Sequence, residues 1–158
     1  MTSDTANETG LDRFEDPEEE LSVGLLLVAG RLLRRLDEVC KSFGLTDDQY
    51  NVLRILGAAG PTGLPRFAIA ERLLRRAPDV TRLLDRLETK GLVSRTRAEP
   101  DRRLSISTIS PEGSELLQVM SRDVRQVRLE LTEALSAAEK EDLRRLLARL
   151  IEGEEKGT

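Results

Sequence analysis

Residues 78–97 have the sequence PDVTRLLDRLETKGLVSRTR, and the spacing of the apolar residues changes within them. In the first part, apolar residues recur three and four positions apart, which is typical of one buried face of an α-helix. These positions are Val80, Leu83, Leu84 and Leu87. Because Pro78 is favoured in a first helical turn and Gly91 at a helix stop, we predict a helix over 78–90.

After Gly91 the apolar residues alternate with polar ones, which is typical of a half-buried β-strand. The alternation covers residues 92–97 and returns over residues 104–109. The segment between them, residues 98–103, is polar and charged. We therefore predict a β-hairpin directly after the helix, and we call it the wing (residues 93–109).

Another short helix is predicted before this one, over residues 65–74. Four apolar residues lie there at helical spacing, and we expect all four to be buried. They are Phe67, Ile69, Ala70 and Leu73. Pro78 disfavours helical geometry at Ala77, so a tight break separates the two helices. Two helices joined in this way and followed by a hairpin form a winged helix-turn-helix, here over about residues 64–109.

The dimensions of DNA suggest tasks for the exposed residues of this lobe. The major groove admits one α-helix, whose N-terminal residues lie nearest the base edges, so Thr81 and Arg82 are predicted to contact bases. Arg86 lies further along and is predicted to contact phosphate. Asp85 either orients one of these arginines or is a solvated acid. The other candidates for DNA contact in and beside the break are Asp79, Arg75 and Arg76.

The wing tip has a different predicted task, because a narrow minor groove has a strongly negative potential. Arg102 and Arg103 are the candidates to enter it, and Asp101 is expected to support the tip by holding an arginine or backbone amides. Residues 61–103 contain eleven Lys or Arg and six Asp or Glu, whereas the whole chain has a net charge of −4. A basic segment in an acidic chain fits a phosphate-binding surface, and a solvated helix face gives the same pattern.

Amphipathic helices are predicted on both sides of the lobe. The first covers residues 17–42, and a capping box formed by Thr46 and Gln49 begins the next. A helix over 111–135 carries apolar residues three and four positions apart, as in a coiled coil. They are Leu117, Met120, Val124, Val127, Leu131 and Ala134. Such a seam packs either within the chain or against a second copy, and a symmetric homodimer accounts for it because the same patch meets itself.

A final helix is predicted over residues 137–152, after a capping box formed by Ser136 and Glu139. We expect one of its faces to be buried. That face comprises Leu143, Leu146, Leu147, Leu150 and Ile151. The expected fold is mainly α-helical with a small β-wing. Its parts are a flexible acidic tail (1–16), an N-terminal dimerisation helix (17–44), the DNA-binding winged helix-turn-helix lobe (45–110), C-terminal dimerisation helices (111–152) and a flexible tail (153–158).

Composition argues against several classes of function. The chain contains no histidine, so it lacks the side chain best suited to proton transfer near neutral pH. Its single cysteine, Cys40, cannot form a disulfide within the chain. It also lacks a glycine-rich phosphate loop and a nucleophile motif, and we predict no enzymatic activity, metal site or cofactor. Cys40 is expected to be a small buried apolar residue rather than a redox sensor. The acidic N-terminus and the short apolar run over 23–30 predict a cytoplasmic protein without a membrane span.

Three separated blocks resemble the multiple-antibiotic-resistance regulator (MarR) family, and the order of elements is similar over about residues 20–152. The blocks are residues 79–93, Pro100-Asp101-Arg102-Arg103 and Ser110-Pro111-Glu112-Gly113. The resemblance implies a homodimer held by its terminal helices, in which each lobe binds one half-site of double-stranded operator DNA. It also implies DNA contacts by Thr81, Arg82 and Arg103, and a wing-shaping role for Asp101.

The expected function is therefore a sequence-specific dimeric transcription regulator, most simply a repressor. Other members of the family bind small aromatic acids or phenols, so a small-molecule effector stays open, and the sequence identifies no ligand-binding residue. The alternative is a helical dimeric protein-interaction module without sequence-specific DNA binding. The basic wing together with Thr81 and Arg82 favours the regulator, because a lobe that binds only protein has no evident need for them.

Overall fold

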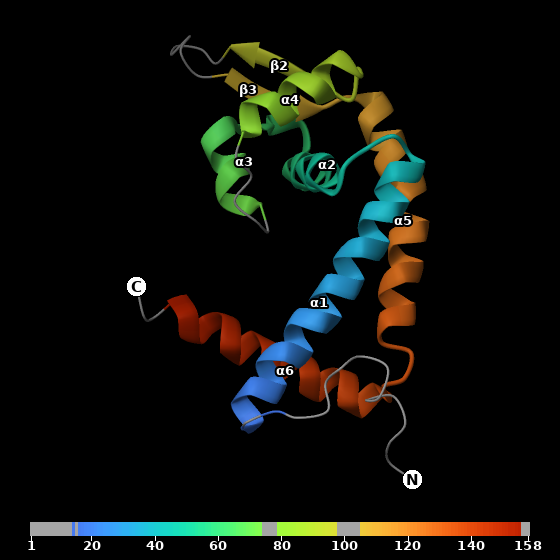
Figure 1. Cartoon of the computed structure of the whole chain (residues 1–158). Coiled ribbons are helices and arrows are strands. Elements are labelled where there is room, and N and C mark those ends of the chain that lie inside the picture. Colours follow the sequence, from blue (N-terminus) through green and yellow to red (C-terminus); the bar gives the residue numbers. More distant parts are fainter. Residues whose placement is uncertain (1–13, 15, 74–78, 98–104, 156–158) are drawn as a thin grey trace. The chain divides into compact units, whose positions relative to one another are not determined.

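The structure, a computed structural model, describes residues 14, 16–73, 79–97 and 105–155 (Figure 1). Its elements are α1 (Pro17–Ser42), α2 (Asp47–Ala59), the 3-10 helix η2 (Gly60–Thr62), β1 (Leu64–Pro65), α3 (Arg66–Arg72), α4 (Val80–Thr89), β2 (Val93–Arg97), β3 (Ser105–Ile109), α5 (Pro111–Leu131) and α6 (Ala137–Glu155). The chain divides into two compact units, Met1–Arg35 and Leu36–Thr158, and the boundary falls within α1. The helices and the β-hairpin expected from the sequence are confirmed within these residues, and the structure adds η2 and the strand β1.

Side-chain caps begin α2 and α6 where the sequence predicts them. The Thr46 hydroxyl accepts from the backbone N–H of Gln49 (3.2 Å), and the Thr46 N–H donates to the Gln49 side chain (3.0 Å). Ser136 and Glu139 form the equivalent reciprocal pair, with 2.8 Å between the Ser136 nitrogen and Glu139 Oε2. These bonds satisfy backbone groups that a helix end leaves unpaired, so the local sequence fixes both starts.

Several helix ends differ from the prediction. The helix expected over 78–90 begins at Val80, because Asp79 has non-helical backbone angles and caps it. The helix expected over 111–135 ends at Leu131, where the N–H groups of Thr132 and Glu133 bond to carbonyls three residues back and close the last turn. The final helix continues to Glu155 rather than ending near residue 152.

A three-stranded antiparallel sheet adjoins α4, with the strand order β1-β3-β2. The β2–β3 hairpin is the predicted wing, and it pairs Val93 with Ile109 and Arg97 with Ser105. The third strand, β1, was not predicted: Leu64 lies opposite Ser107, and Pro65, expected to start a helix, is extended. Figure 1 shows α4 beside the hairpin, with α2 and α3 in the same lobe.

One hydrophobic core joins α2, α3, α4 and the hairpin to the C-terminal part of α1 and to α5. Its fully enclosed side chains include Leu53, Leu56, Ile69, Leu84 and Leu87. The expectation for α3 is only partly confirmed. Ile69 is buried and Leu73 packs against the core, but Phe67 is 55% exposed and Ala70 is exposed as well. At 3.6 residues per turn, Phe67 lies about 200° around the helix from Ile69 and Ala70 about 100°, so the two cannot face the core together with Ile69.

The coiled-coil-like seam on α5 lies largely inside the chain. Met120 and Val124 are buried in the same core as Cys40 and Leu53, and Val127 is buried too. Ala134, expected to continue the seam, lies beyond the helix and is exposed. The middle of the seam therefore packs within this chain rather than against a second copy.

Apolar residues are exposed on the terminal helices instead. The five residues of α6 that were expected to be buried are all exposed in the single chain. They are Leu143 (39%), Leu146 (48%), Leu147 (37%), Leu150 (59%) and Ile151 (64%). On α1, Leu26 is 72% exposed and Leu21 is 66% exposed. Exposed apolar surface of this extent on two helices is typical of an interaction surface.

Candidate nucleic-acid interface

Helix α4 is positioned by its cap and by its apolar face. The Oδ1 atom of Asp79 accepts from the Arg82 backbone N–H at 3.0 Å, which satisfies one of the unpaired donors of the first turn. Val80, Leu84 and Leu87 are buried in the core. Burial of this face fixes the rotation of α4 about its axis and therefore decides which residues face solvent.

The opposite face of α4 is polar and exposed. Thr81 and Arg82 lie in the first turn, and Arg86 follows one turn later. A shallow depression of about 400 Å³ runs along this face, lined by Arg82, Asp85, Arg86, Thr89 and Lys90. An exposed helix with basic residues on its outer face and Thr81 near its N-terminus has the shape and charge that a DNA groove accepts.

The wing is joined to α4 by an arginine that sequence reasoning missed. From β2, Arg95 Nε donates to Glu88 Oε2 at 2.9 Å, and its Nη2 donates to Asp85 Oδ1 at 2.6 Å and also to Glu88. These hydrogen bonds, led by the one to Glu88, raise the pKa of Arg95 against the opposing effect of partial burial. Asp85 was expected to orient Arg82 or Arg86 or to be solvated. It instead helps Glu88 to hold the wing.

The C-terminal end of α4 is tied to the rest of the lobe. The Lys90 ammonium donates to the Gly44 carbonyl at 3.0 Å, and the Ser110 hydroxyl donates to the Gly91 carbonyl at 2.7 Å. Ser110 also caps α5, because its Oγ accepts from the Gly113 N–H. Both ends of α4 and the base of the wing are thus held by specific hydrogen bonds.

The predicted contact residues divide into two groups. The structure places Asp79, Thr81, Arg82 and Arg86 together at the exposed side of α4. The remaining candidates lie outside the described residues, and they stay predictions. They are Arg75, Arg76, Asp101, Arg102 and Arg103. The signal that could have found Arg95 is the pair Asp85 and Glu88, two acids one turn apart on a helix that precedes a basic strand.

The exposed Phe67 has a place beside this surface. Together with Thr81, Arg95 and Pro65 it lines a cavity of about 280 Å³ between α3, α4 and the sheet.

Over the part of the chain that the structure describes, no cluster of three or more His, Cys, Asp or Glu side chains could hold a metal ion. Within the same residues, no helix is both long and apolar enough to cross a membrane.

Comparison with known proteins adds independent evidence. A model described as the MarR family matches residues 43–104. A MarR transcription factor from Planctomyces limnophilus is 35% identical with a TM-score of 0.67, and the match covers 86% of this chain and 98% of that one. A mutant MarR from E. coli complexed with operator DNA is 26% identical with a TM-score of 0.74, covering 94% of this chain and 99% of that one.

A curated relative agrees with these structures. The HTH-type transcriptional regulator FarR from Neisseria gonorrhoeae is 27% identical over 130 residues, which are 82% of this chain and 88% of FarR. The similarity therefore extends beyond the winged lobe to the helices on either side of it. From its elements, its sequence blocks and these relatives, the chain belongs to the MarR family of transcription regulators.

Proposed function

We propose that the chain is a dimeric, sequence-specific DNA-binding regulator that inserts α4 into the major groove of its operator. The observation that carries this proposal is the exposed face of α4, where Thr81 and Arg82 occupy the first turn and Arg86 follows. Thr81 and Arg82 are proposed to contact base edges, and Arg86 to contact phosphate. The E. coli MarR relative complexed with operator DNA supports this use of the lobe.

The wing is proposed to follow the DNA backbone into the adjacent minor groove. Arg95 anchors β2 to α4, so the two DNA-facing elements move together. Arg102 and Arg103 at the tip are proposed to enter the groove, with Asp101 shaping the tip. Arg75, Arg76 and Asp79 complete the proposed contact set, with Arg75 and Arg76 on phosphate and Asp79 at the start of α4.

A homodimer is proposed to form through the terminal helices. Helix α6 exposes Leu146, Leu150 and Ile151, and α1 exposes Leu21 and Leu26. A symmetric dimer buries these side chains against a second copy and brings two lobes to one DNA site. We therefore assign residues 17–44 and 111–152 to dimerisation and residues 45–110 to DNA binding.

The proposed regulation is repression, in which an occupied operator excludes RNA polymerase from an overlapping promoter. A protein of this kind acts in the cytoplasm and needs no enzymatic activity, as the sequence predicts. The sequence does not decide whether a small-molecule effector controls DNA binding, and such control is compatible with repression.

The experiment that tests the proposal is binding of the purified chain to DNA from its own promoter region and to a shuffled version, at several salt concentrations. We expect tight binding to the promoter alone and a steep loss of affinity with salt, because arginine–phosphate contacts release counterions. Footprinting should show two half-sites about one helical turn apart. Equal and weak affinity for both DNAs would overturn the proposal and favour the protein-interaction module.

A further inference from the structure

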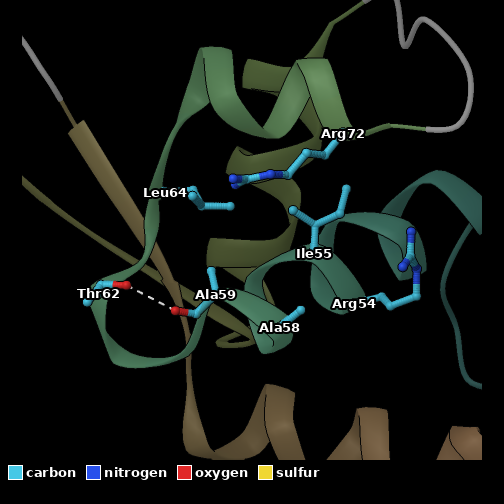
Figure 2. A pocket seen from close by; sticks show the side chains of 7 residues that line it. All are labelled: Arg54, Ile55, Ala58, Ala59, Thr62, Leu64 and Arg72. Atoms are coloured by element: carbon cyan, nitrogen blue, oxygen red, sulfur yellow. Dashed lines mark hydrogen bonds between the residues drawn. The ribbon is translucent and has the colours of Figure 1, made fainter.

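A second cavity lies in the winged lobe and is bounded by α2, η2, β1 and α3. Its volume is about 580 Å³, which falls in the range of about 300–1,000 Å³ that ligand pockets occupy. The seven lining residues are Arg54, Ile55, Ala58, Ala59, Thr62, Leu64 and Arg72 (Figure 2). None of the residues that line the exposed face of α4 is among them.

The floor of this cavity is apolar. Ile55 is 5% exposed, and Leu64 and Ala59 are half-buried. Thr62 contributes no free donor, because its hydroxyl donates to the Ala59 carbonyl at 3.0 Å (Figure 2). The lining side chains therefore offer an occupant hydrogen-bond donors only through Arg54 and Arg72.

Two guanidinium groups flank the apolar floor. Figure 2 shows those of Arg54 and Arg72 on opposite sides of Ile55. No acid is present among the residues that line the cavity, and neither arginine forms an ion pair with any residue that the structure describes. Each guanidinium carries a permanent positive charge and a planar set of donors that matches a carboxylate in a two-point contact.

The arrangement selects among classes of ligand. A metal cation is repelled by two positive charges, and an uncharged apolar molecule gains no ion pair from either guanidinium group. A monocarboxylate forms an ion pair with one arginine and leaves the other, half-buried Arg54 or exposed Arg72, to water. A molecule with a carboxylate at each end and an apolar body between them matches both charges and the floor.

We propose that this cavity is a binding site for a small organic dicarboxylate, with one carboxylate on Arg54 and the other on Arg72. The apolar part of the ligand lies over Ile55 and Leu64. This site is separate from the proposed DNA-contact face, so binding of the dicarboxylate does not require DNA.

The test is calorimetric titration of the full chain, in the absence of DNA, with succinate, adipate and suberate. Hexanoate and octanoate serve as monocarboxylates matched in length to adipate and suberate. We expect at least one dicarboxylate to bind about tenfold more tightly than its matched monocarboxylate, the scale of one additional charge-assisted hydrogen-bonded pair. Because DNA is absent, failure here is distinct from failure of the proposed DNA binding.

Variants locate the binding. Arg54→Gln and Arg72→Gln should each reduce dicarboxylate affinity to the monocarboxylate level, whereas Arg66→Gln, on α3 but outside this cavity, should leave it unchanged. Thermal unfolding of each variant checks that the fold is retained, so a loss of binding is not a loss of structure. Absence of binding for all three dicarboxylates would overturn the proposal. Wild-type affinity in both cavity variants would overturn it too, because the ligand would then lie elsewhere.

Discussion

Arg95 of β2 and Asp85 of α4 lie 2.6 Å apart between Nη2 and Oδ1, and this contact links the wing to the helix that is proposed to enter the major groove. Glu88, one turn further along α4, accepts from the same guanidinium. Arg95 is mostly covered, with 24% of its side chain exposed, whereas that of Asp85 is 53% exposed. The single positive charge of Arg95 therefore offsets part of the negative charge of two acids beside Arg82 and Arg86 that would otherwise repel DNA.

Arg95→Gln should weaken operator binding more than it weakens the fold. A surface ion pair contributes about 1 kcal/mol or less to the free energy of unfolding, so the melting temperature should change little. Loss of one positive charge and exposure of two negative ones near the phosphates should lower operator affinity about tenfold at low salt. Fluorescence anisotropy with labelled operator DNA and thermal unfolding measure the two effects.

A second substitution distinguishes positioning from direct DNA contact by Arg95. Adding Asp85→Asn to Arg95→Gln removes one uncompensated acid, so part of the lost affinity should return. Arg97→Gln is the control on the same strand, and there Asp85→Asn should give a smaller recovery, because Arg95 already offsets the charge of Asp85. If Asp85→Asn restores no operator affinity in the Arg95→Gln variant, then Arg95 contacts DNA directly. The proposal that Arg95 acts by holding Asp85 and the wing in place would then be wrong.

Gly113 is required by a close approach between α5 and the loop after α4. A Cβ atom at this position would lie 2.2 Å from the Leu92 carbonyl oxygen, which belongs to the backbone and cannot turn aside. Gly113→Ala should therefore lower the free energy of unfolding by about 1–3 kcal/mol or more. Gly153→Ala, in α6 with open space around it, should raise it by about 0.5–1 kcal/mol. Denaturant unfolding of both variants checks the pair, and equal effects would contradict the close approach.

The thiol of Cys40 should ionise only at high pH. Burial first, and then the carboxylates of Asp47 and Asp37, raise its pKa from the ordinary 9.0 to about 11. In the unfolded chain the thiol loses its proton near pH 9, so stability from the folded thiol is complete below pH 9 and is lost as the pH rises toward 11.

Cys40→Ala isolates this effect, because alanine does not titrate. The stability advantage of the wild type over Cys40→Ala should shrink between pH 9 and 11, by at most about 1.4 kcal/mol per pH unit. Unfolding in urea across this range measures it. A difference that stays constant with pH would show that the pKa is not raised, and rapid alkylation of the folded protein at neutral pH would show that the thiol is not buried.

The exposed leucines of α6 should hold the dimer together. Leu146 and Leu150 lie one turn apart and are both largely exposed in the single chain, so Leu146→Glu with Leu150→Glu should leave the lobe folded. Light scattering after size-exclusion chromatography should give the mass of a dimer for the wild type and of a monomer for this double variant. Glu152→Lys, on the opposite face of α6, is the control. A dimeric double variant would place the interface elsewhere.

The sequence was sufficient for most elements because their signals are local. The Thr46–Gln49 capping box and the four apolar positions of α4 lie within a few residues of one another, and each local preference agrees with the final structure. The start of α4 was placed slightly early, because Pro78 is compatible with a first turn and Asp79 is compatible with a cap. Thr81, Arg82 and Arg86 were placed on the exposed face for the same local reason.

The features that were missed depend on contacts between distant segments. The strand β1 has two residues, too few for an alternating pattern, and forms only because β3 provides a partner. Arg95 pairs with Asp85 and Glu88 through the packing of the wing on α4, and the spacing of the two acids does not say which arginine of the wing they hold. The spacing of apolar residues also identifies the apolar face of α6. It does not indicate whether residues of the same chain or of a second copy cover that face.

The central claim is that α4 contacts bases through its first turn, and the most direct test is the base preference of Arg82→Ala. Operator affinity would be measured for the natural site and for single-base variants at every position, with Arg122→Ala, an exposed arginine of α5, as the charge-matched control. We predict that Arg82→Ala loses about 1–3 kcal/mol of operator affinity and all preference at one base position in each half-site, while Arg122→Ala keeps both. Unchanged affinity and base preference in Arg82→Ala would contradict the account.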